Sequence, residues 1–408
     1  MNPTLGLGLL LASLLAEDGL VRAGFAPKVL GTWKGRAAAQ ELSRRNADFG
    51  FKLFKKLTSR SPASNIFISP LSISTAFSML CLGAQDSTLA EIKQGFNLQN
   101  LPDRTLHEGF RDLIQRLSQA HHGHNLDLEN ALFVDRKLQP QQKFLTNAKN
   151  LYGAETITTN FQDLKAARRE INDYVSQKTR GNINELIRHI MPGTLMLLTN
   201  CLFFRGRWLQ EFDPNATKEE DFLLDGDQTV KVSMMHHGGM YEAGRDDQLP
   251  CSILEMPFQD NISAVFILPD EGKMKQVEEA LSASTFERWR GLLNRRVTNV
   301  SLPRFSISGT YDLKKTLSYL GIRKIFEEHG DLTRISPHQN LKIGEAVHKA
   351  KLKMDEHGAE AAASSGAQTL PMEKPFSMKM NRPFLLAIKE KTVPAVLFLG
   401  KLANPSGK

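Results

Sequence analysis

The sequence predicts an α+β fold built as one large domain. Strand-like segments follow one another in the second half of the chain, and helical patterns interrupt them in two places. Such grouping of strands with segregated helices is typical of α+β proteins and not of regular βαβ alternation. Hydrophobic residues make up 41% and charged residues 24% of the 408 residues, enough to bury a large core. No Gly/Ser- or Pro-rich linker divides the chain, which favours a single domain.

The N-terminus carries the one segment that resembles a targeting signal. An apolar run rich in leucine occupies residues 5–15 and is followed by Glu17 and Asp18. A bilayer span takes about 20 residues, so the run is too short to cross a membrane and instead resembles the core of a secretory signal peptide. We therefore predict a signal peptide at residues 1–20, an N-terminal extension at residues 21–37 and a single domain at residues 38–408. A buried N-terminal helix is the alternative.

The cysteines and the known catalytic motifs exclude several classes of protein. Only Cys81, Cys201 and Cys251 occur, so no disulfide framework is predicted. No Cys-x-x-Cys pair or matching histidine pair is present, so no metal site is expected. No Walker loop, dinucleotide fingerprint or Gly-x-Ser-x-Gly motif lies outside the apolar N-terminal run. The chain is therefore predicted to use no cofactor and not to be an enzyme.

Glycosylation motifs and charge agree with export. Sequons at Asn215 and Asn261 are the predicted glycosylation sites, and a third at Asn299 runs into a strand-like segment and is weaker. The net charge is +8. A secreted basic protein meets sulfated glycans and not nucleic acid, so heparin or heparan sulfate is an expected partner. No later stretch of 18 apolar residues occurs, and we expect a secreted, extracellular monomer without a membrane span.

Two helices are predicted early in the chain. The first begins near Ala38 and stacks apolar side chains at a spacing of four residues. A short strand at residues 65–68 precedes the second, for which Ser69 is a suitable N-cap and Pro70 a suitable first residue. This second helix, residues 71–82, is apolar nearly all round and is therefore expected to lie in the core.

Further elements follow from capping and apolar patterns. Capping boxes at residues 88–91 and 105–108 predict the starts of two helices. Helical patterns are also predicted at residues 274–293 and 313–326. The predicted strand segments are residues 195–208, 252–268, 297–306, 341–355 and 384–402.

Residues 358–373 form a tract of unusual composition after the fourth strand segment. No proline occurs before Pro371, so every amide of residues 358–370 can enter a β-ladder. Alternate residues from Ala359 to Thr369 are all small, and the other phase carries Glu360, Gln368 and Leu370. A segment of this pattern can enter a sheet with its small face buried, and residues 358–371 would span roughly 45 Å when extended. A flexible linker is the alternative on composition alone.

Six motifs, taken together and in order, resemble the serpin family, and in particular its clade A. The resemblance covers residues 38–408. The motifs are Asn65-Ile-Phe-Ile-Ser-Pro-Leu-Ser-Ile73, Asn200-x-x-Phe-Phe-x-Gly-x-Trp208, Leu302-Pro-x-Phe305, His348-Lys-Ala350, Asp355-Glu-x-Gly-x-Glu-Ala-Ala-Ala363 and Arg382-Pro-Phe384.

The resemblance implies a fold and a mechanism. The fold would be the serpin fold, with three β-sheets, about nine helices and an exposed reactive-centre loop at about residues 356–377. Serpins are cleaved sixteen positions after the hinge glutamate, which here gives the reactive bond Met372–Glu373. A serine protease would form an acyl-enzyme at Met372, and the freed loop would insert into the central sheet. The hinge residues so implied are Glu356, Gly358, Ala359, Ala361, Ala362 and Ala363.

The same resemblance implies two structural sites beneath the loop. The shutter, under the middle of the central sheet, would contain Ser69, Ser72, Asn200 and His348. The breach, where the loop first enters, would contain Trp208, Arg304 and Glu356. As lone residues, a histidine or an asparagine is more often a satisfied polar group of the core.

The loop sequence predicts the class of protease. Met372 is unbranched and apolar, which suits a chymotrypsin-like or elastase-like S1 pocket and not a trypsin-like one. The neighbouring residues Leu370 and Pro371 would add specificity, and Glu373 would exclude proteases with electronegative primed sites. By resemblance, the expected target is a chymotrypsin-like tissue kallikrein, kallikrein 7.

Alternation along two strands predicts a basic stripe on the central sheet. If His348 faces the core, then Lys349, Lys351 and Lys353 face away from it, and the same holds for Arg205 and Arg207 if Asn200 faces inward. We expect the stripe to bind heparin-like glycans, with an ordinary solvated row of cations as the alternative. A non-inhibitory clade A serpin that acts as a carrier or a receptor ligand is the alternative function.

Overall fold

A computed structural model describes residues 33–119, 124–224, 228–259, 261–337, 341–356, 374–392 and 395–407. The predicted signal peptide lies outside these described residues. So do Leu370, Pro371, the reactive bond at Met372 and Glu373, and the hinge residues from Gly358 to Ala363.

The described part of the chain contains nine α-helices. Their bounds are α1 (Trp33–Arg60), α2 (Pro70–Leu80), α3 (Asp86–Gly95), α4 (Asp103–Gln119), α5 (Gln142–Tyr152), α6 (Leu164–Lys178), α7 (Met274–Ala280), α8 (Ala283–Leu292) and α9 (Leu313–Ser318). Two short 3-10 helices are η1 (Pro214–Ala216) and η2 (Lys324–Phe326).

Fourteen strands occur in the same described ranges. Five of them are β1 (Ile66–Ile68), β2 (His124–Asp135), β3 (Glu155–Thr159), β4 (Met196–Gly206) and β5 (Lys218–Leu223). The next five are β6 (Thr229–Asp246), β7 (Cys251–Pro257), β8 (Ile262–Pro269), β9 (Asn294–Pro303) and β10 (Phe305–Asp312). The last four are β11 (Glu345–Met354), β12 (Phe376–Lys379), β13 (Phe384–Glu390) and β14 (Ala395–Leu402).

The predicted α+β fold with three sheets is confirmed. The central sheet has the strand order β10-β11-β4-β2-β3. The other two sheets, β1-β14-β13-β8-β7 and β5-β6-β9-β12, form one continuous ladder of nine strands because β6 also pairs with β7. Residues 234–243 of β6 pair with β9, and residues 242–246 pair with β7, so the hydrogen-bonded ladder runs on from one sheet to the next.

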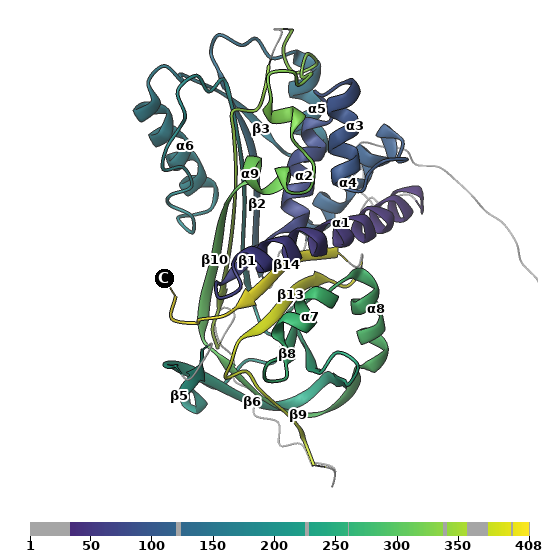
Figure 1. Cartoon of the computed structure of the whole chain (residues 1–408), viewed down its shortest axis with the longest axis vertical. Helices are drawn as coiled ribbons and strands as arrows, with labels where there is room; N and C mark the ends of the chain where they lie inside the picture. Colours follow the sequence, from purple (N-terminus) through teal and green to yellow (C-terminus); the bar gives the residue numbers. More distant parts are fainter. Residues whose placement is uncertain are drawn as a thin grey trace, which may run out of the picture.

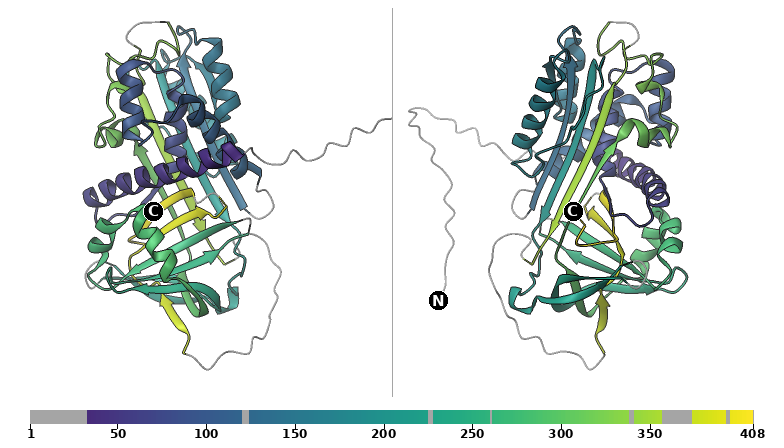
Figure 2. Two further views of the ribbon diagram at one scale, coloured as in Figure 1. Left: turned by 90° about the vertical axis from the view of Figure 1, so that its right-hand side faces the viewer. Right: turned by 60° about the vertical axis from the view of Figure 1, so that its left-hand side comes forward.

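The helices cover the central sheet unequally. Figure 1 shows α2 to α5 on one face of the sheet, which we call the inner face, and α6 alone on the other, the outer face. In the left view of Figure 2, α1 crosses in front of the sheet, between these helices and the strands β13 and β14. The middle strand β4 is therefore buried on both faces, whereas alternate residues of the edge strand β10 are exposed.

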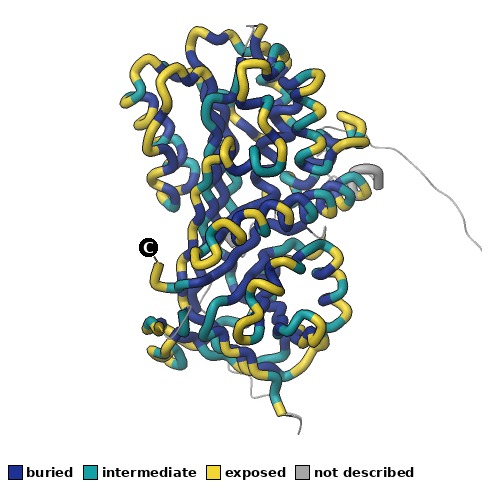
Figure 3. The backbone as a smooth tube through the Cα atoms, in the orientation of Figure 1, coloured by how far each residue is buried: buried dark blue, intermediate teal, exposed yellow. Residues whose placement is uncertain are grey.

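The apolar core follows from this layering. The largest apolar cluster joins the inner face to α1, α2 and the other two sheets. A second, smaller cluster joins α6 to the outer face. Figure 3 shows the buried backbone along the central strands and exposed residues on the outer turns of α6. Within the inner layer, α2 is buried along its whole length, as predicted from its apolar sequence.

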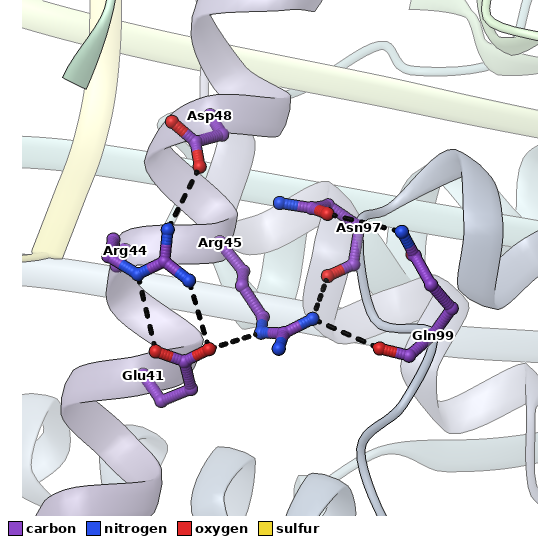
Figure 4. A network of polar contacts seen from close by, with 6 residues as sticks. All are labelled: Glu41, Arg44, Arg45, Asp48, Asn97 and Gln99. Atoms are coloured by element: carbon purple, nitrogen blue, oxygen red, sulfur yellow. Dashed lines mark hydrogen bonds and ion pairs between the residues drawn. The ribbon is translucent and has the colours of Figure 1, made fainter. Parts of the chain in front are cut away.

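A polar network fixes α1 to the turn that follows α3. Arg45 donates hydrogen bonds to the carbonyl oxygens of Asn97 at 2.8 Å and Gln99 at 3.1 Å, and its Nε donates to Glu41 at 2.6 Å. Hydrogen bonds from Arg44 and then from Arg45 hold the pKa of Glu41 below its ordinary value. Figure 4 shows the whole group: Glu41, Arg44, Arg45, Asp48, Asn97 and Gln99.

Several predicted boundaries differ from the structure for local reasons. The first helix begins at Trp33 and not near Ala38. Both predicted capping boxes are wrong, because α3 begins at Asp86 and α4 at Asp103. Thr88 instead accepts a hydrogen bond from the backbone N–H of Asp331 at 2.9 Å, so its hydroxyl serves a tertiary contact. The segment predicted as one strand at residues 252–268 is two strands, β7 and β8, separated by a turn.

Candidate functional site

Four polar residues form a row across the inner face of the central sheet. Tyr311 on β10 is paired with His348 on β11, His348 with Asn200 on β4, and Asn200 with Asn130 on β2. Because paired residues of adjacent strands lie side by side, these registers alone bring the four side chains into one line. His348 and Asn200 are fully buried.

Hydrogen bonds connect this row to the start of α2. The backbone N–H of Ser69 donates to His348 Nε2 at 3.1 Å, and His348 Nδ1 lies 2.6 Å from Asn200 Oδ1. The Ser72 hydroxyl donates to the same Asn200 oxygen at 2.7 Å. Asn200 Nδ2 in turn donates to the carbonyl of Ser72 at 3.0 Å and to Asn130 Oδ1 at 2.5 Å. All four residues predicted for the shutter therefore meet in one network.

The N-terminus of α2, which contacts this network, is capped by its own residues. The Ser69 hydroxyl caps the helix by accepting from the Ser72 N–H at 3.1 Å, and Pro70 occupies the first turn, as the sequence predicts. Burial lowers the pKa of His348 to about 3. The imidazole is therefore neutral, which matches an Nε2 atom that accepts a hydrogen bond.

A second group of residues lies where β11 ends. The indole N–H of Trp208 donates to the carbonyl of Asp355 at 3.0 Å, and the Trp208 ring stacks on Phe258 with centroids 4.2 Å apart. The backbone N–H of Phe212 donates to the carbonyl of Glu356 at 3.0 Å. Buried aromatic and backbone contacts thus fix the last described residues before position 357.

The carboxylate of Glu356 is the polar centre of this group. It is buried, and its Oε1 accepts hydrogen bonds from Arg304 and from the Thr217 hydroxyl, the latter at 2.8 Å. Burial opposes the ionised form, but the hydrogen bonds from Arg304 and Thr217 prevail, and the pKa of Glu356 lies below its ordinary value. The three residues predicted for the breach therefore lie close together, with Arg304 linked to Trp208 through residues 355 and 356.

The segment that follows α6 covers one part of the predicted basic stripe and leaves another part uncovered. Lys353 and Arg205, whose side chains are 51% and 35% exposed, both contact Asp355 Oδ2, at 3.3 and 3.4 Å. Lys349 and Lys351 instead donate to the backbone carbonyls of Glu185 at 2.6 Å and Asn182 at 2.9 Å, in the segment that follows α6. Arg207 lies 3.7 Å from Glu211. Only the end of the stripe beside Asp355 faces outward without such cover.

Comparison with protein families identifies the fold. The model of the serpin family, the serine protease inhibitors, matches residues 44–405. The chain is a serpin. As a member of a family of protease inhibitors, the chain is not an enzyme. In the described ranges, no group of three or more His, Cys, Asp and Glu residues could hold a metal ion. No helix described in this serpin is long and apolar enough to cross a membrane.

The serpin is similar to known clade A members over its whole length. It is 60% identical to human Serpin A12 over 415 residues that cover all of both chains, and 54% identical to rat Serpin A12 over 99% of this chain and all of the relative. Residues 79–86 and 367–373 also resemble vaspin, another name of Serpin A12. Human thyroxine-binding globulin in complex with thyroxine superposes with a TM-score of 0.86 at 39% identity, over 91% of this chain and all of the other.

Sequence reasoning missed several members of both sites of this serpin. Asn130 and Tyr311 extend the row that contains the predicted shutter residues, and Thr217 and Asp355 contact the predicted breach residues. A signal for Asn130 was present, because it interrupts the alternating apolar residues 126, 128, 132 and 134 of β2. No comparable pattern marks Thr217, whose role depends on η1 lying beside residue 356. Asn215 and Asn261, the two asparagines predicted to be glycosylated, are both exposed.

Proposed function

We propose that this serpin is a secreted inhibitor of a chymotrypsin-like serine protease, cleaved at Met372–Glu373 and acting by insertion of its loop into the central sheet. The target proposed from the resemblance to vaspin is kallikrein 7. The observation that carries the proposal is the parallel pairing of β11 and β4, because the loop segment continues directly from β11.

The parallel pair leaves a favourable position for one more strand. β11 and β4 are paired from Glu345 and Leu197 to Leu352 and Phe204. A strand that turned back after β11 and entered between them would run antiparallel to both. One parallel ladder would then be replaced by two antiparallel ladders, which are slightly more stable per residue. Residues 358–370 supply small alternate side chains and a full set of backbone amides for this strand.

The chemistry of the reactive bond belongs to the protease. Its serine oxygen attacks the carbonyl carbon of Met372, the peptide bond breaks, and the new amino group of Glu373 leaves after taking up a proton. An ester then joins the protease to Met372. Water can hydrolyse this ester, so inhibition requires insertion to distort the protease active site first. The inhibitor itself contributes no catalytic residue.

Export is part of the proposal. The apolar run at residues 5–15 supports a signal peptide, and the exposure of Asn215 and Asn261 supports their use as glycosylation sites. The proposed environment is therefore extracellular. A monomer is sufficient for the proposed mechanism, because one chain supplies both the loop and the sheet.

Heparin binding is proposed at the outward end of the basic stripe. Arg205 lies on β4 and Lys353 on β11, the two strands that would separate. Both side chains contact the carboxylate of Asp355. A sulfated glycan would compete with this carboxylate for the two cations, in a salt-sensitive way. Arg207, Lys349 and Lys351 would contribute to the same field, with Lys349 and Lys351 partly covered by the segment after α6.

Inhibition is tested by incubation with kallikrein 7, followed by a denaturing gel and mass analysis of the cut. We expect an SDS-stable complex and cleavage after residue 372. M372A should slow complex formation at least tenfold, because the S1 pocket loses its main contact. M191A is the matched control, since Met191 is 66% exposed and distant in sequence, and it should inhibit normally. Cleavage without a stable complex would leave the carrier or receptor-ligand alternative.

Glycan binding is tested by retention on a heparin column. The double variant R205A/K353A should elute at lower salt than the wild type. K165A/K275A removes the same number of positive charges from exposed positions on α6 and α7 and is the matched control. Equal retention of R205A/K353A and the wild type would contradict the proposed glycan site.

A further inference from the structure

The outer face of the central sheet carries an apolar contact with α6. Ile171 and Val175 of α6 pack in one cluster with Phe133 of β2 and Cys201 of β4. Tyr174 meets Phe133 edge to face, with ring centroids 5.5 Å apart. This contact keeps α6 on the sheet in the absence of any strand pairing.

Acidic residues lie at the border of this apolar contact. Asp127 and Glu129 belong to β2, four and two residues before Ala131 of the same cluster, and therefore project from the same outer face. Asp127 Oδ2 is buried without a hydrogen-bond partner, and the other carboxylate oxygen, Oδ1, lies 3.6 Å from Arg180. Among the residues that the structure describes, none donates a hydrogen bond to the half-buried carboxylate of Glu129.

The charges around Glu129 do not compensate for its burial. On its own strand lies Asp127, and on β3 lies Glu155, both of which oppose its ionisation. On α6, Lys178 favours ionisation but already donates to Glu155 at 2.5 Å. Burial and these carboxylates raise the pKa of Glu129 to about 7, with Lys178 opposing the rise.

Further titratable groups complete this surrounding. Burial raises the pKa of Tyr174 on α6, with Glu155 and Glu129 adding to the rise. Across the ladder, Cys201 on β4 is paired with Glu129, and Lys349 on β11 is paired with Cys201. Burial raises the pKa of the Cys201 thiol and lowers the pKa of Lys349. Arg180 lies beside Asp127, and Lys351 on β11 is in line with Asp127 through Phe203 of β4. Burial also raises the pKa of Asp127.

A continuous set of contacts joins α6 to β11. The side chain of Asn172 on α6 accepts hydrogen bonds from the backbone N–H groups of Leu186 and Ile187, each at 2.9 Å, and donates to the Ile187 carbonyl at 2.8 Å. The carbonyl of Glu185 in the same segment accepts from Lys349 of β11. A loosening of α6 therefore loosens a segment that holds β11 from the outer face.

We propose that Glu129 is a proton switch for the position of α6: the protonated side chain lets α6 pack firmly on the sheet, and the carboxylate weakens that packing. Because residues 182–187 follow α6 and hold β11, deprotonation also eases the separation of β11 from β4. This second consequence rests on the proposed inhibitory function. The first does not.

The direction of the pH dependence follows from linkage. The ordinary pKa of a glutamate is 4.5, and the pKa of Glu129 is about 7 when α6 is packed on the sheet. Between these two pH values, the state with α6 packed on the sheet therefore binds more protons than the open state, in which α6 has moved away from the sheet. Opening of α6 therefore becomes more favourable as the pH rises, by at most tenfold per pH unit, and levels off above about pH 7.

The switch is tested on the intact protein by hydrogen exchange of the α6 amides between pH 5 and pH 8, corrected for the chemical exchange rate. In the wild type, exchange should rise at least tenfold between pH 5 and pH 7. E129Q keeps the shape and the neutrality of the protonated side chain, so its α6 should exchange at pH 7.5 as slowly as the wild type does at pH 5. E170Q, on the exposed face of α6, should behave as the wild type.

Two results separate the switch from the inhibitory function. If α6 in wild type and in E129Q shows the same pH dependence, the proton switch is refuted. A wild type that forms no complex with the protease at any pH, while α6 still responds to pH through Glu129, would refute only the inhibitory proposal. With both intact, the rate of complex formation should rise from pH 5 to pH 7 in the wild type and in E170Q, and stay low in E129Q.

Discussion

His348 can occupy its place in the central sheet only as a neutral ring. Its Nε2 accepts from the Ser69 N–H, so the single ring proton lies on Nδ1 and is donated to Asn200. A second proton on Nε2 would face a donor and would be buried without a counter-charge. Burial lowers the pKa of His348 to about 3, in agreement with the neutral ring that these hydrogen bonds require.

The stability of the protein should consequently fall in acid. The unfolded chain takes up a proton at His348 near pH 6.5 and the folded chain only near pH 3, so the unfolded state gains protons first as the pH falls. Between these values the free energy of unfolding should decrease by at most about 1.4 kcal/mol per pH unit. Urea unfolding at several pH values measures this slope.

A non-titrating variant isolates the contribution of His348. H348Q should lose about 1–3 kcal/mol at pH 7, because the hydrogen bonds to Ser69 and Asn200 are not both restored, and its acid slope should be smaller than that of the wild type. H329Q, at an exposed histidine, is the control and should keep the wild-type slope. An unchanged slope in H348Q would show that other groups cause the acid sensitivity.

Among the elements, α1 depends on one arginine for its attachment to the turn after α3. The Arg45 side chain is 15% exposed and satisfies two backbone carbonyls, whereas the Arg44 side chain is 59% exposed and forms ion pairs with Glu41 and Asp48. R45A should therefore lower the free energy of unfolding by about 1–2 kcal/mol, and R44A by about 0–1 kcal/mol. Equal effects would contradict the structural role of Arg45.

The sequence predicts elements well where one periodicity dominates. The helix at residues 71–82 and the strand at residues 341–355 agree with α2 and β11 to within a few residues. Two neighbouring strands with apolar ends are read as one, as for β7 and β8, because a short turn interrupts the pattern only briefly. β2 was not predicted, because Asn130, which belongs to the polar row, interrupts the apolar alternation of this strand.

At the scale of the whole molecule, the family resemblance correctly implied the serpin fold, and the shutter residues it named meet in the structure. Alternation alone predicts that the side chains of His348 and Asn200 point from their strands toward the core of the protein. It does not predict that β11 and β4 are neighbours, which decides that the two side chains touch. That adjacency comes from strands separated by more than a hundred residues in the chain, and local patterns contain no information about it.

The polar row has a consequence for how the central sheet assembles. Side chains alternate between the two faces, so displacing β11 by one residue against β4 would turn His348 toward α6 and push the ammonium group of Lys349 into the apolar interior. A buried, unpaired ammonium group is far more costly than the correct arrangement. The native alignment is thus strongly preferred over its nearest competitors, and errors of one position during folding should be rare and short-lived.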